Sequence, residues 1–188
     1  AAGELRRHGV DSRDVGTGAG RMGLYYLING AIHRPSEVLY DRAGSAFALA
    51  DPRIYDWDAL LAGADWLHLS GVTPALGKAA ADAAQQAAEA ATRLGVRLSF
   101  DGNYRSKLWE AWDGQPAQRL RALLAHCEVL FASDRDIGVI LGDVAHPEDP
   151  AERIAAAAAR AFAAFPRLQS MATTLRTQRS VDHHVLSA

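Results

Sequence analysis

One strand–helix–strand pattern limits the folds open to this chain more than any other feature of its sequence. Trp66-Leu67-His68-Leu69 has the composition of a buried strand, and the long alanine-rich stretch that ends at Arg93-Leu94-Gly95 has that of a helix. Thr73-Pro74 predicts where this helix starts, because threonine caps helix N-termini and proline fits the first turn. The apolar run over 96–100 predicts a second strand, parallel to the first in a right-handed βαβ unit. We therefore expect an α/β fold.

The same alternation continues to the end of the chain, so that residues from about 57 to 188 are expected to form one α/β core. Asp149-Pro150 predicts the cap and the first turn of another alanine-rich helix. The further expected elements are helices over 120–125, 136–141 and 150–165, and strands over 128–131, 169–174 and 181–188.

Upstream of this core, two short segments over about 21–42 predict a small antiparallel hairpin. The first ends at the turn signal Asn29-Gly30, and the second is Val38-Leu39-Tyr40-Asp41-Arg42. Side chains alternate along a strand, so Tyr40 and Arg42 are expected on one face. Together with Tyr25 they could stack on a polyol and clamp a carboxylate at two points. The alternative is an edge ribbon with ordinary cross-strand packing and a solvated arginine.

Polar side chains follow the strand over 96–100 without a gap. They are Asp101, Asn103, Tyr104 and Arg105. In open α/β sheets, ligands bind beyond the carboxyl ends of the strands, so this loop is a candidate ligand wall. In the alternative interpretation, Asp101 and Asn103 close turns through their own backbone and Arg105 lies on the surface.

Ser133 and Asp136 follow the expected strand over 128–131. Their spacing matches a capping box, in which each side chain bonds the backbone of the other. A second interpretation places the same groups near Mg²⁺ or a phosphate. Residue type alone favours the cap.

Two other patterns fail on context. Gly18-Ala19-Gly20-Arg21-Met22-Gly23 matches a dinucleotide-binding fingerprint, but that fingerprint needs a hydrophobic strand before it and a helix after it. Here a polar segment precedes and an aromatic strand follows. His183-His184 would point to opposite faces of a strand and could not easily share one metal ion.

Composition excludes several classes of protein. The 188 residues, 49% of them hydrophobic, suffice for one domain with a substantial core. A formal net charge of −2 with interspersed signs gives no footprint for nucleic acid, and no apolar run approaches the length of a membrane span. The single cysteine, Cys127, excludes an internal disulfide and favours the cytoplasm. The chain opens without methionine on what resembles the last turns of a helix and Gly9, so we expect it to be part of a longer protein.

Several segments taken together resemble the ribokinase-like (PfkB) carbohydrate kinases, and among them the kinases of 2-keto-3-deoxygluconate. The resemblance covers essentially the whole chain. The segments that carry it are Gly23-Leu24-Tyr25-Tyr26, Arg34-Pro35-Ser36, Tyr40-Asp41-Arg42-Ala43-Gly44-Ser45-Ala46, Leu67-His68-Leu69-Ser70-Gly71-Val72-Thr73-Pro74-Ala75-Leu76 and Asp101-Gly102-Asn103-Tyr104-Arg105-Ser106-Lys107-Leu108-Trp109.

The resemblance implies a ribokinase-like α/β/α sandwich with a small β-sheet lid over the sugar site. The exposed face of such a lid hairpin would also suit self-association into a homo-oligomer. It implies contacts to the keto-acid substrate, with Arg42 on its carboxylate, from Tyr25, Tyr40, Asp41, Arg42, Val72 and Arg105. It implies contacts to ATP from Asn103, Tyr104, Arg105, Ser133 and Asp136. Ser133 and Asp136 stand where the family has Asn-x-x-Glu, a motif linked to Mg²⁺ and phosphate.

By this resemblance, the parent protein transfers the γ-phosphate of ATP to the 6-hydroxyl of 2-keto-3-deoxy-D-gluconate. Two family segments have no counterpart here: an upstream glycine-rich sugar-binding segment, and Gly-Ala-Gly-Asp with the anion hole and the catalytic base. We therefore expect the 188 residues to be a central fragment, incomplete at both ends and inactive alone. The alternatives are a fructokinase-like or ribokinase-like enzyme, and a non-catalytic binding or dimerisation module.

Overall fold

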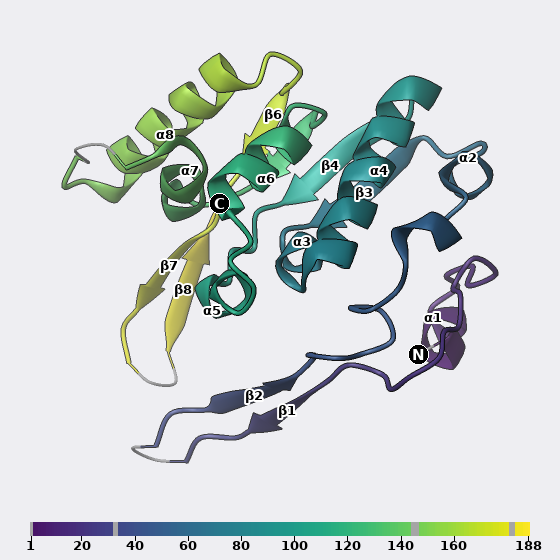
Figure 1. Ribbon diagram of the computed structural model, residues 1–188. Coiled ribbons are helices and arrows are strands. Elements are labelled where there is room, and N and C mark those ends of the chain that lie inside the picture. Colours follow the sequence, from purple (N-terminus) through teal and green to yellow (C-terminus); the bar gives the residue numbers. More distant parts are fainter. Residues whose placement is uncertain (1, 32–33, 144–146, 181–182) are drawn as a thin grey trace.

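The structure of the protein is a computed structural model that describes the chain except residues 1, 32–33, 144–146 and 181–182 (Figure 1). The helices are α1 (Ala2–Arg7), the 3₁₀ helix η1 (Pro52–Ile54), α2 (Trp57–Leu60), α3 (Val72–Ala75), α4 (Lys78–Leu94), α5 (Ser106–Glu110), α6 (Pro116–Leu124), α7 (Asp134–Leu141) and α8 (Pro150–Ala164). The strands are β1 (Leu24–Ile28), β2 (Glu37–Asp41), β3 (Trp66–Ser70), β4 (Arg97–Asp101), β5 (Val129–Phe131), β6 (Ser170–Ala172), β7 (Leu175–Gln178) and β8 (His184–Ser187).

The largest sheet has four parallel strands in the order β3-β4-β5-β6. In its register, Leu67 pairs with Leu98, and Phe100 pairs with Leu130. The helices α4, α6, α7 and α8 form one row, each in contact with the next (Figure 1). The predicted α/β fold with a parallel sheet is confirmed.

The core lies between this sheet and the row of helices. Leu98, Phe100 and Leu130 are fully buried and pack with Trp109 and Ile137. Successive strand residues point to opposite faces, so their neighbours are more exposed, and burial alternates along β4. Cys127, the single cysteine, is a free and buried thiol.

The prediction that 66–69 is a buried strand is wrong for two of its side chains. Trp66 is 41% exposed and His68 is also exposed, whereas Leu67 and Leu69 pack against the core. Leu67 and Leu69 share one face of β3, and Trp66 and His68 share the other. On that second face, the Arg97 guanidinium lies 4.0 Å from the centre of the Trp66 ring. The strand is therefore buried on one face only.

The predicted start of the long helix is also wrong. Thr73 and Pro74 belong to the short helix α3, and α4 begins only after Gly77. Gly77 has φ +147°, a conformation that a continuous helix cannot contain. The predicted end is confirmed, because Gly95 closes α4 in the left-handed conformation.

Two glycines connect the ends of β3, β4 and β5. The Gly71 N–H donates to the Asp101 carbonyl at 2.7 Å, and the Gly102 N–H donates to the Phe131 carbonyl at 2.7 Å. A Cβ atom at Gly71 would overlap the carbonyl oxygen of Gly102. Only glycine permits this approach, which gathers the loops that follow β3, β4 and β5.

The β1–β2 hairpin stands apart from the large sheet (Figure 1), and its register places Tyr25 opposite Tyr40. Nearly all of its side chains are exposed. A second hairpin, β7–β8, lies near the end of the chain, and its first strand was not predicted. Among the described residues, none of the helices combines the length and the apolar composition that crossing a bilayer requires.

Candidate functional site

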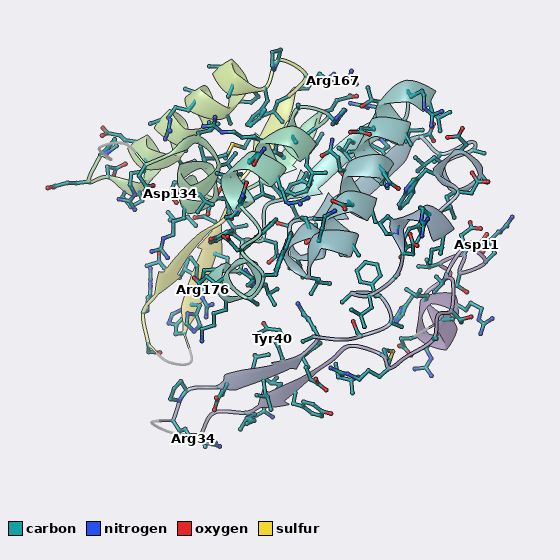
Figure 2. All side chains as sticks on the ribbon, in the orientation of Figure 1. Asp11, Arg34, Tyr40, Asp134, Arg167 and Arg176 are labelled. Atoms are coloured by element: carbon teal, nitrogen blue, oxygen red, sulfur yellow. The ribbon has the colours of Figure 1, made fainter. Side chains whose placement is uncertain are left out.

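A cavity of about 910 Å³ lies between the β1–β2 hairpin and the carboxyl-terminal edge of the large sheet. Figure 2 shows Tyr40 between the hairpin and the α/β core. The hairpin side of the cavity is lined by Glu37, Val38, Leu39, Tyr40 and Arg42. The core side is lined by Asn103, Tyr104, Arg105, Ser106, Lys107, Leu108, Ser133, Arg135, Asp136 and Val139. Seven residues singled out in the sequence thus meet around one space.

On the hairpin side, Arg42 and Tyr40 form a unit. The Arg42 guanidinium carbon lies 4.6 Å from the centre of the Tyr40 ring, within the range of a cation–π contact. Among the described residues, no acidic side chain pairs with Arg42. Its charge is therefore available to a ligand in the cavity.

Three of the predicted substrate residues lie elsewhere. The Tyr25 ring packs beside the Tyr40 ring at a centroid distance of 6.5 Å, but Tyr25 is not among the described residues that line the cavity. Val72, half-buried at the start of α3, does not line it either. The Asp41 carboxylate accepts hydrogen bonds from both terminal nitrogens of Arg21, at 2.8 and 2.6 Å. The roles predicted for these three residues stay predictions.

On the core side, the loop after β4 turns sharply at Asn103. This residue has φ +39°, in the left-handed region that asparagine tolerates. Its side-chain amide donates to the Ser70 hydroxyl at 3.3 Å, which ties the loop to the end of β3. Arg105 Nη1 donates to the Tyr104 carbonyl at 2.9 Å. The Arg105 guanidinium thus reaches the cavity from a braced turn.

Asp136 connects this loop to α7. Its Oδ2 accepts from the Ser133 N–H at 2.8 Å and from the Ser133 hydroxyl at 2.6 Å, and the Ser133 hydroxyl accepts the Asp136 N–H. The predicted capping box is confirmed. Asp136 Oδ1 also accepts the Tyr104 N–H at 3.2 Å. One carboxylate therefore caps α7 and holds the neighbouring loop.

The charges around the cavity favour an anionic ligand. Four cations line it, Arg42, Arg105, Lys107 and Arg135, against two acids, Glu37 and Asp136. Lys107 and Arg135 have no hydrogen-bond or ion-pair partner among the described residues. The sequence analysis did not assign them a role. Each lies within two residues of a residue that it did assign, and that proximity is the signal that could have identified them.

A second hollow, of about 620 Å³, adjoins the first and shares Asn103, Ser133 and Asp136 with it. Asp101 and His68 also line this hollow. Burial, followed by the nearby charge of Asp136, raises the pKa of the Asp101 carboxyl above its usual value. The charge of Asp136 is thus close enough to oppose ionisation of Asp101.

These two carboxylates are also candidate ligands of a divalent metal ion. Within the described part of the chain, no cluster of three or more His, Cys, Asp or Glu side chains is suited to hold a metal ion. Mg²⁺ does not require such a cluster, because it commonly takes one or two carboxylates and completes its shell with water and substrate phosphates. Asp101 and Asp136 fit that pattern.

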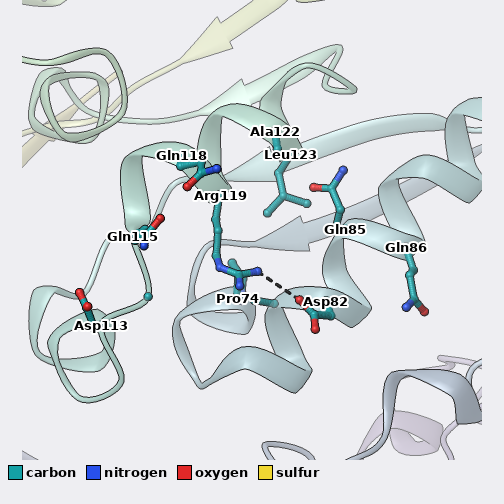
Figure 3. A pocket seen from close by; sticks show the side chains of 12 residues that line it. Pro74, Asp82, Gln85, Gln86, Asp113, Gln115, Gln118, Arg119, Ala122 and Leu123 are labelled. Atoms are coloured by element: carbon teal, nitrogen blue, oxygen red, sulfur yellow. Dashed lines mark hydrogen bonds and ion pairs between the residues drawn. The ribbon is translucent and has the colours of Figure 1, made fainter.

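A third cavity, of about 480 Å³, lies on the helical side between α4 and α6 (Figure 3). Its arginine, Arg119, is bound to Asp82 at 3.2 Å. Glutamine side chains, including Gln85 and Gln118, supply much of the remaining polar surface. With its cation neutralised, this cavity offers little to an anion and carries no candidate site.

Comparison with known proteins identifies the relatives of this chain. The pfkB family of carbohydrate kinases matches residues 1–164. The 2-dehydro-3-deoxygalactonokinase of Haloferax volcanii is 37% identical over 138 residues, which cover 73% of this chain and 42% of that protein. The 2-dehydro-3-deoxygluconokinase of Thermoproteus tenax is 32% identical over 150 residues, covering 77% and 43%.

Solved structures agree with these matches. The crystal structure of 2-dehydro-3-deoxygluconokinase from Thermotoga maritima has a TM-score of 0.87 and 35% identity, covering 98% of this chain and 55% of its own. A PfkB family carbohydrate kinase from Listeria grayi has a TM-score of 0.84 and 31% identity, covering 99% and 55%. The chain spans about half the length of the relatives that it matches. By sequence and by its ribokinase-like fold, the chain belongs to the pfkB family of carbohydrate kinases.

Proposed function

We propose that this chain forms the ligand-binding part of a sugar-acid kinase, which transfers the γ-phosphate of ATP to the 6-hydroxyl of 2-keto-3-deoxy-D-gluconate. One observation carries the proposal: Tyr40 and Arg42 of the hairpin line the same cavity as Arg105 of the core. The names of the relatives support the choice of substrate class.

The hairpin supplies the groups that a sugar acid needs. Arg42 has a planar guanidinium that can bind both oxygens of a carboxylate, and no acidic residue among those described competes for it. The Tyr40 ring offers a flat apolar surface and a hydroxyl to the carbon chain. We assign Tyr25, Asp41 and Val72 to the surroundings of this subsite, and Arg105 to its boundary with the phosphate donor.

The core supplies the groups that a triphosphate needs. Arg105, Lys107 and Arg135 carry positive charge on that side of the cavity, and Asn103 and Tyr104 shape the loop between them. Ser133 and Asp136 lie at the start of α7, beside this loop. Asp101 and Asp136 would hold Mg²⁺, which would supply positive charge to the phosphate groups.

In the proposed reaction, the 6-hydroxyl oxygen of the sugar acid attacks the γ-phosphorus in line, and ADP leaves. Positioning and charge stabilisation provide most of the catalysis in such transfers. Arg42 would fix one end of the acceptor, while Arg105 would stand where the acceptor meets the donor. The group that takes the hydroxyl proton is assigned to no residue of this chain. The proposal therefore concerns ligand binding by these residues and turnover by the protein that carries them.

A comparison of carboxylate-bearing and neutral sugars tests the proposal. ATP consumption by the protein is measured with 2-keto-3-deoxygluconate, its galactonate counterpart and fructose. We expect Arg42→Ala to lower kcat/KM for the keto acids by at least about tenfold, since it removes a charge-assisted bond, and to leave any activity on fructose unchanged. Equal losses on all sugars, or efficient phosphorylation of fructose alone, would favour the fructokinase-like alternative instead.

The exposed apolar side chains of β1 support a second role, self-association through the lid. Leu24, Tyr26 and Ile28 point away from the face that bears Tyr25 and Tyr40, and they are 38%, 51% and 40% exposed. Exposed apolar patches commonly mark protein interfaces. We expect Tyr26→Glu to lower the mass measured by light scattering to that of one chain. An unchanged mass would count against this role.

A further inference from the structure

The glycine-rich segment ahead of β1 packs against the loop that follows β2. Gly20 has φ +118°, and a Cβ atom there would lie 3.5 Å from the Cα of Ala46. A Cβ atom at Gly23 would lie 3.6 Å from the Cα of Arg42. Between these glycines, the Arg21 carbonyl accepts the Ala46 N–H at 2.8 Å. The segment thus lies in ordinary contact with this loop, and Gly20 is the position within it whose backbone conformation favours glycine.

The Arg21 side chain spans the same loop. Its Nη1 donates to Asp41 Oδ2 at 2.8 Å and to the Asp41 carbonyl at 3.3 Å. Its Nη2 donates to Asp41 Oδ1 at 2.6 Å and to the Ala43 carbonyl at 2.5 Å. Arg21 therefore bonds the residue before Arg42 and the residue after it.

Arg42 itself has few restraints. Its guanidinium stacks on the Tyr40 ring, and no acidic group among the described residues fixes it. The path of the backbone through 41–43 consequently decides where this guanidinium stands in the cavity. The Arg21 side chain holds this path through the Asp41 and Ala43 carbonyls, beside the Ser45 N–H, which donates to the Arg42 carbonyl.

We infer that Arg21 is a positioning residue, which holds Arg42 in place for the carboxylate of the substrate. The inference rests on the proposed function. Direct binding of substrate by Arg21 is a poorer explanation, because both of its terminal nitrogens are engaged and it is not among the described residues that line the cavity. A role in stability alone is also poorer. The Arg21 and Asp41 side chains are 43% and 48% exposed, and exposed ion pairs contribute little to the free energy of unfolding.

Affinities of the protein for 2-keto-3-deoxygluconate and for ATP, measured by titration calorimetry, test the inference. Arg21→Gln should weaken binding of the keto acid about tenfold and leave ATP affinity unchanged. The keto-acid affinity of Arg21→Lys should lie between those of Arg21→Gln and the unsubstituted protein. One ammonium group cannot bind the Asp41 carboxylate and both backbone carbonyls at once. The matched control is Arg53→Gln, which removes another Arg–Asp pair, with Asp51, away from the cavity. This control should change neither affinity.

A double substitution separates positioning from an independent contact. If Arg21 acts through Arg42, Arg21→Gln should add no further loss in a protein that already carries Arg42→Gln. Additive losses, or normal keto-acid affinity in Arg21→Gln, would overturn the inference while the proposed function stands. If Arg42→Gln alone leaves keto-acid binding intact, or the unsubstituted protein does not bind the acid, the proposed function fails and takes the inference with it.

Discussion

Tyr25 and Tyr40 lie directly opposite each other in the β1–β2 hairpin, with ring centroids 6.5 Å apart and ring planes inclined by 45°. Although the two rings are neighbours, Tyr40 alone of the pair is among the described residues that line the large cavity, and it also supports Arg42. The two tyrosines are therefore not equivalent with respect to a ligand.

Substitution of these tyrosines should separate their roles. Tyr40→Ala removes the ring under the Arg42 guanidinium, a contact of about 1 kcal/mol, and should weaken keto-acid binding about fivefold. Tyr40→Phe keeps the ring and should lose less. Tyr25→Ala should change the affinity less than Tyr40→Ala does. Titration calorimetry measures the keto-acid affinity of the three variants. A larger loss of affinity for Tyr25→Ala than for Tyr40→Ala would contradict this description of the site.

Lys107 and Arg135 should matter for the phosphate donor and not for the acceptor. Lys107→Met and Arg135→Gln each remove from the cavity wall a cation that has no ion-pair partner among the described residues, and each should weaken ATP binding about tenfold. Adenosine, which lacks phosphates, should bind the variants and the unsubstituted protein equally. Added salt should reduce the difference in ATP affinity between the variants and the unsubstituted protein, since salt screens exposed charges.

Arg6→Gln, on the exposed surface of α1, is the control for this pair. A loss of ATP affinity of the same size in Arg6→Gln would show a general effect of net charge. Equal losses of affinity for adenosine and for ATP in the Lys107 and Arg135 variants would show that the two cations do not bind the phosphates.

Gly71→Ala should destabilise the fold. The new methyl group would overlap the Gly102 carbonyl at the point where β3 and β4 end, and this backbone is held by the hydrogen bond from Gly71 to Asp101. Forced overpacking of this kind costs about 1–3 kcal/mol of unfolding free energy. Urea denaturation measures the change. Gly3→Ala is the matched control, because nothing lies within 4 Å of its Cβ position, and it should be neutral or slightly stabilising.

The Asp101 carboxyl should make stability depend on pH. Burial, followed by the charge of Asp136, raises its pKa above the ordinary 3.8, so the folded state holds this proton more tightly than the unfolded state does. The associated stability is fully present below pH 3.8 and is lost as pH rises through the higher folded-state pKa. Asp101→Asn should therefore be more stable than the unsubstituted protein at neutral pH, and the difference should close in acid.

Urea denaturation over a series of pH values measures this difference. Asp58→Asn provides a control of opposite sign, because the hydrogen bond from Arg93 lowers the pKa of Asp58. That variant should lose stability at neutral pH and recover relative to the unsubstituted protein in acid. A difference for Asp101→Asn that stays constant with pH would contradict the raised pKa.

Local signals predicted much of this fold. Apolar runs predicted β3, β4 and β5, Gly95 predicted the end of α4, and Asp149-Pro150 predicted the start of α8, while β6 lies within the strand predicted over 169–174. The capping box of Ser133 and Asp136 was recognised from spacing alone. Each of these signals acts within a few residues of chain, which is the range over which sequence determines backbone conformation directly.

Features that depend on tertiary structure were harder to predict. The break at Gly77 was hidden, because a glycine inside an alanine-rich run resembles a tolerated helix residue. The exposure of Trp66 depends on which face of the sheet the helices cover, and its strand does not encode that choice. The β7 strand has a polar sequence and is defined by pairing with β8.

The candidate site shows the same division. Tyr40, Arg42 and Arg105 were predicted from residue type and family resemblance, and they line one cavity. Lys107 and Arg135 were missed because neither belongs to a recognised motif, and their place in one cavity with Arg42 and Arg105 comes from the folded arrangement. The Arg21–Asp41 pair joins residues 20 positions apart, and no local pattern announces it.

Asp41 and Arg42 are consecutive residues whose side chains serve opposite surfaces, one bound to Arg21 and the other facing the cavity. Deletion of a single residue within β2 would move each following side chain to the other face of the strand. The Asp41 carboxylate would then point into the cavity, at the position where Arg42 is proposed to bind the substrate carboxylate. The number of residues in β2 is thus constrained as strictly as the residue types at positions 41 and 42. When homologous sequences are aligned, a gap inside this strand should signal a changed substrate, even where tyrosine, aspartate and arginine are all retained.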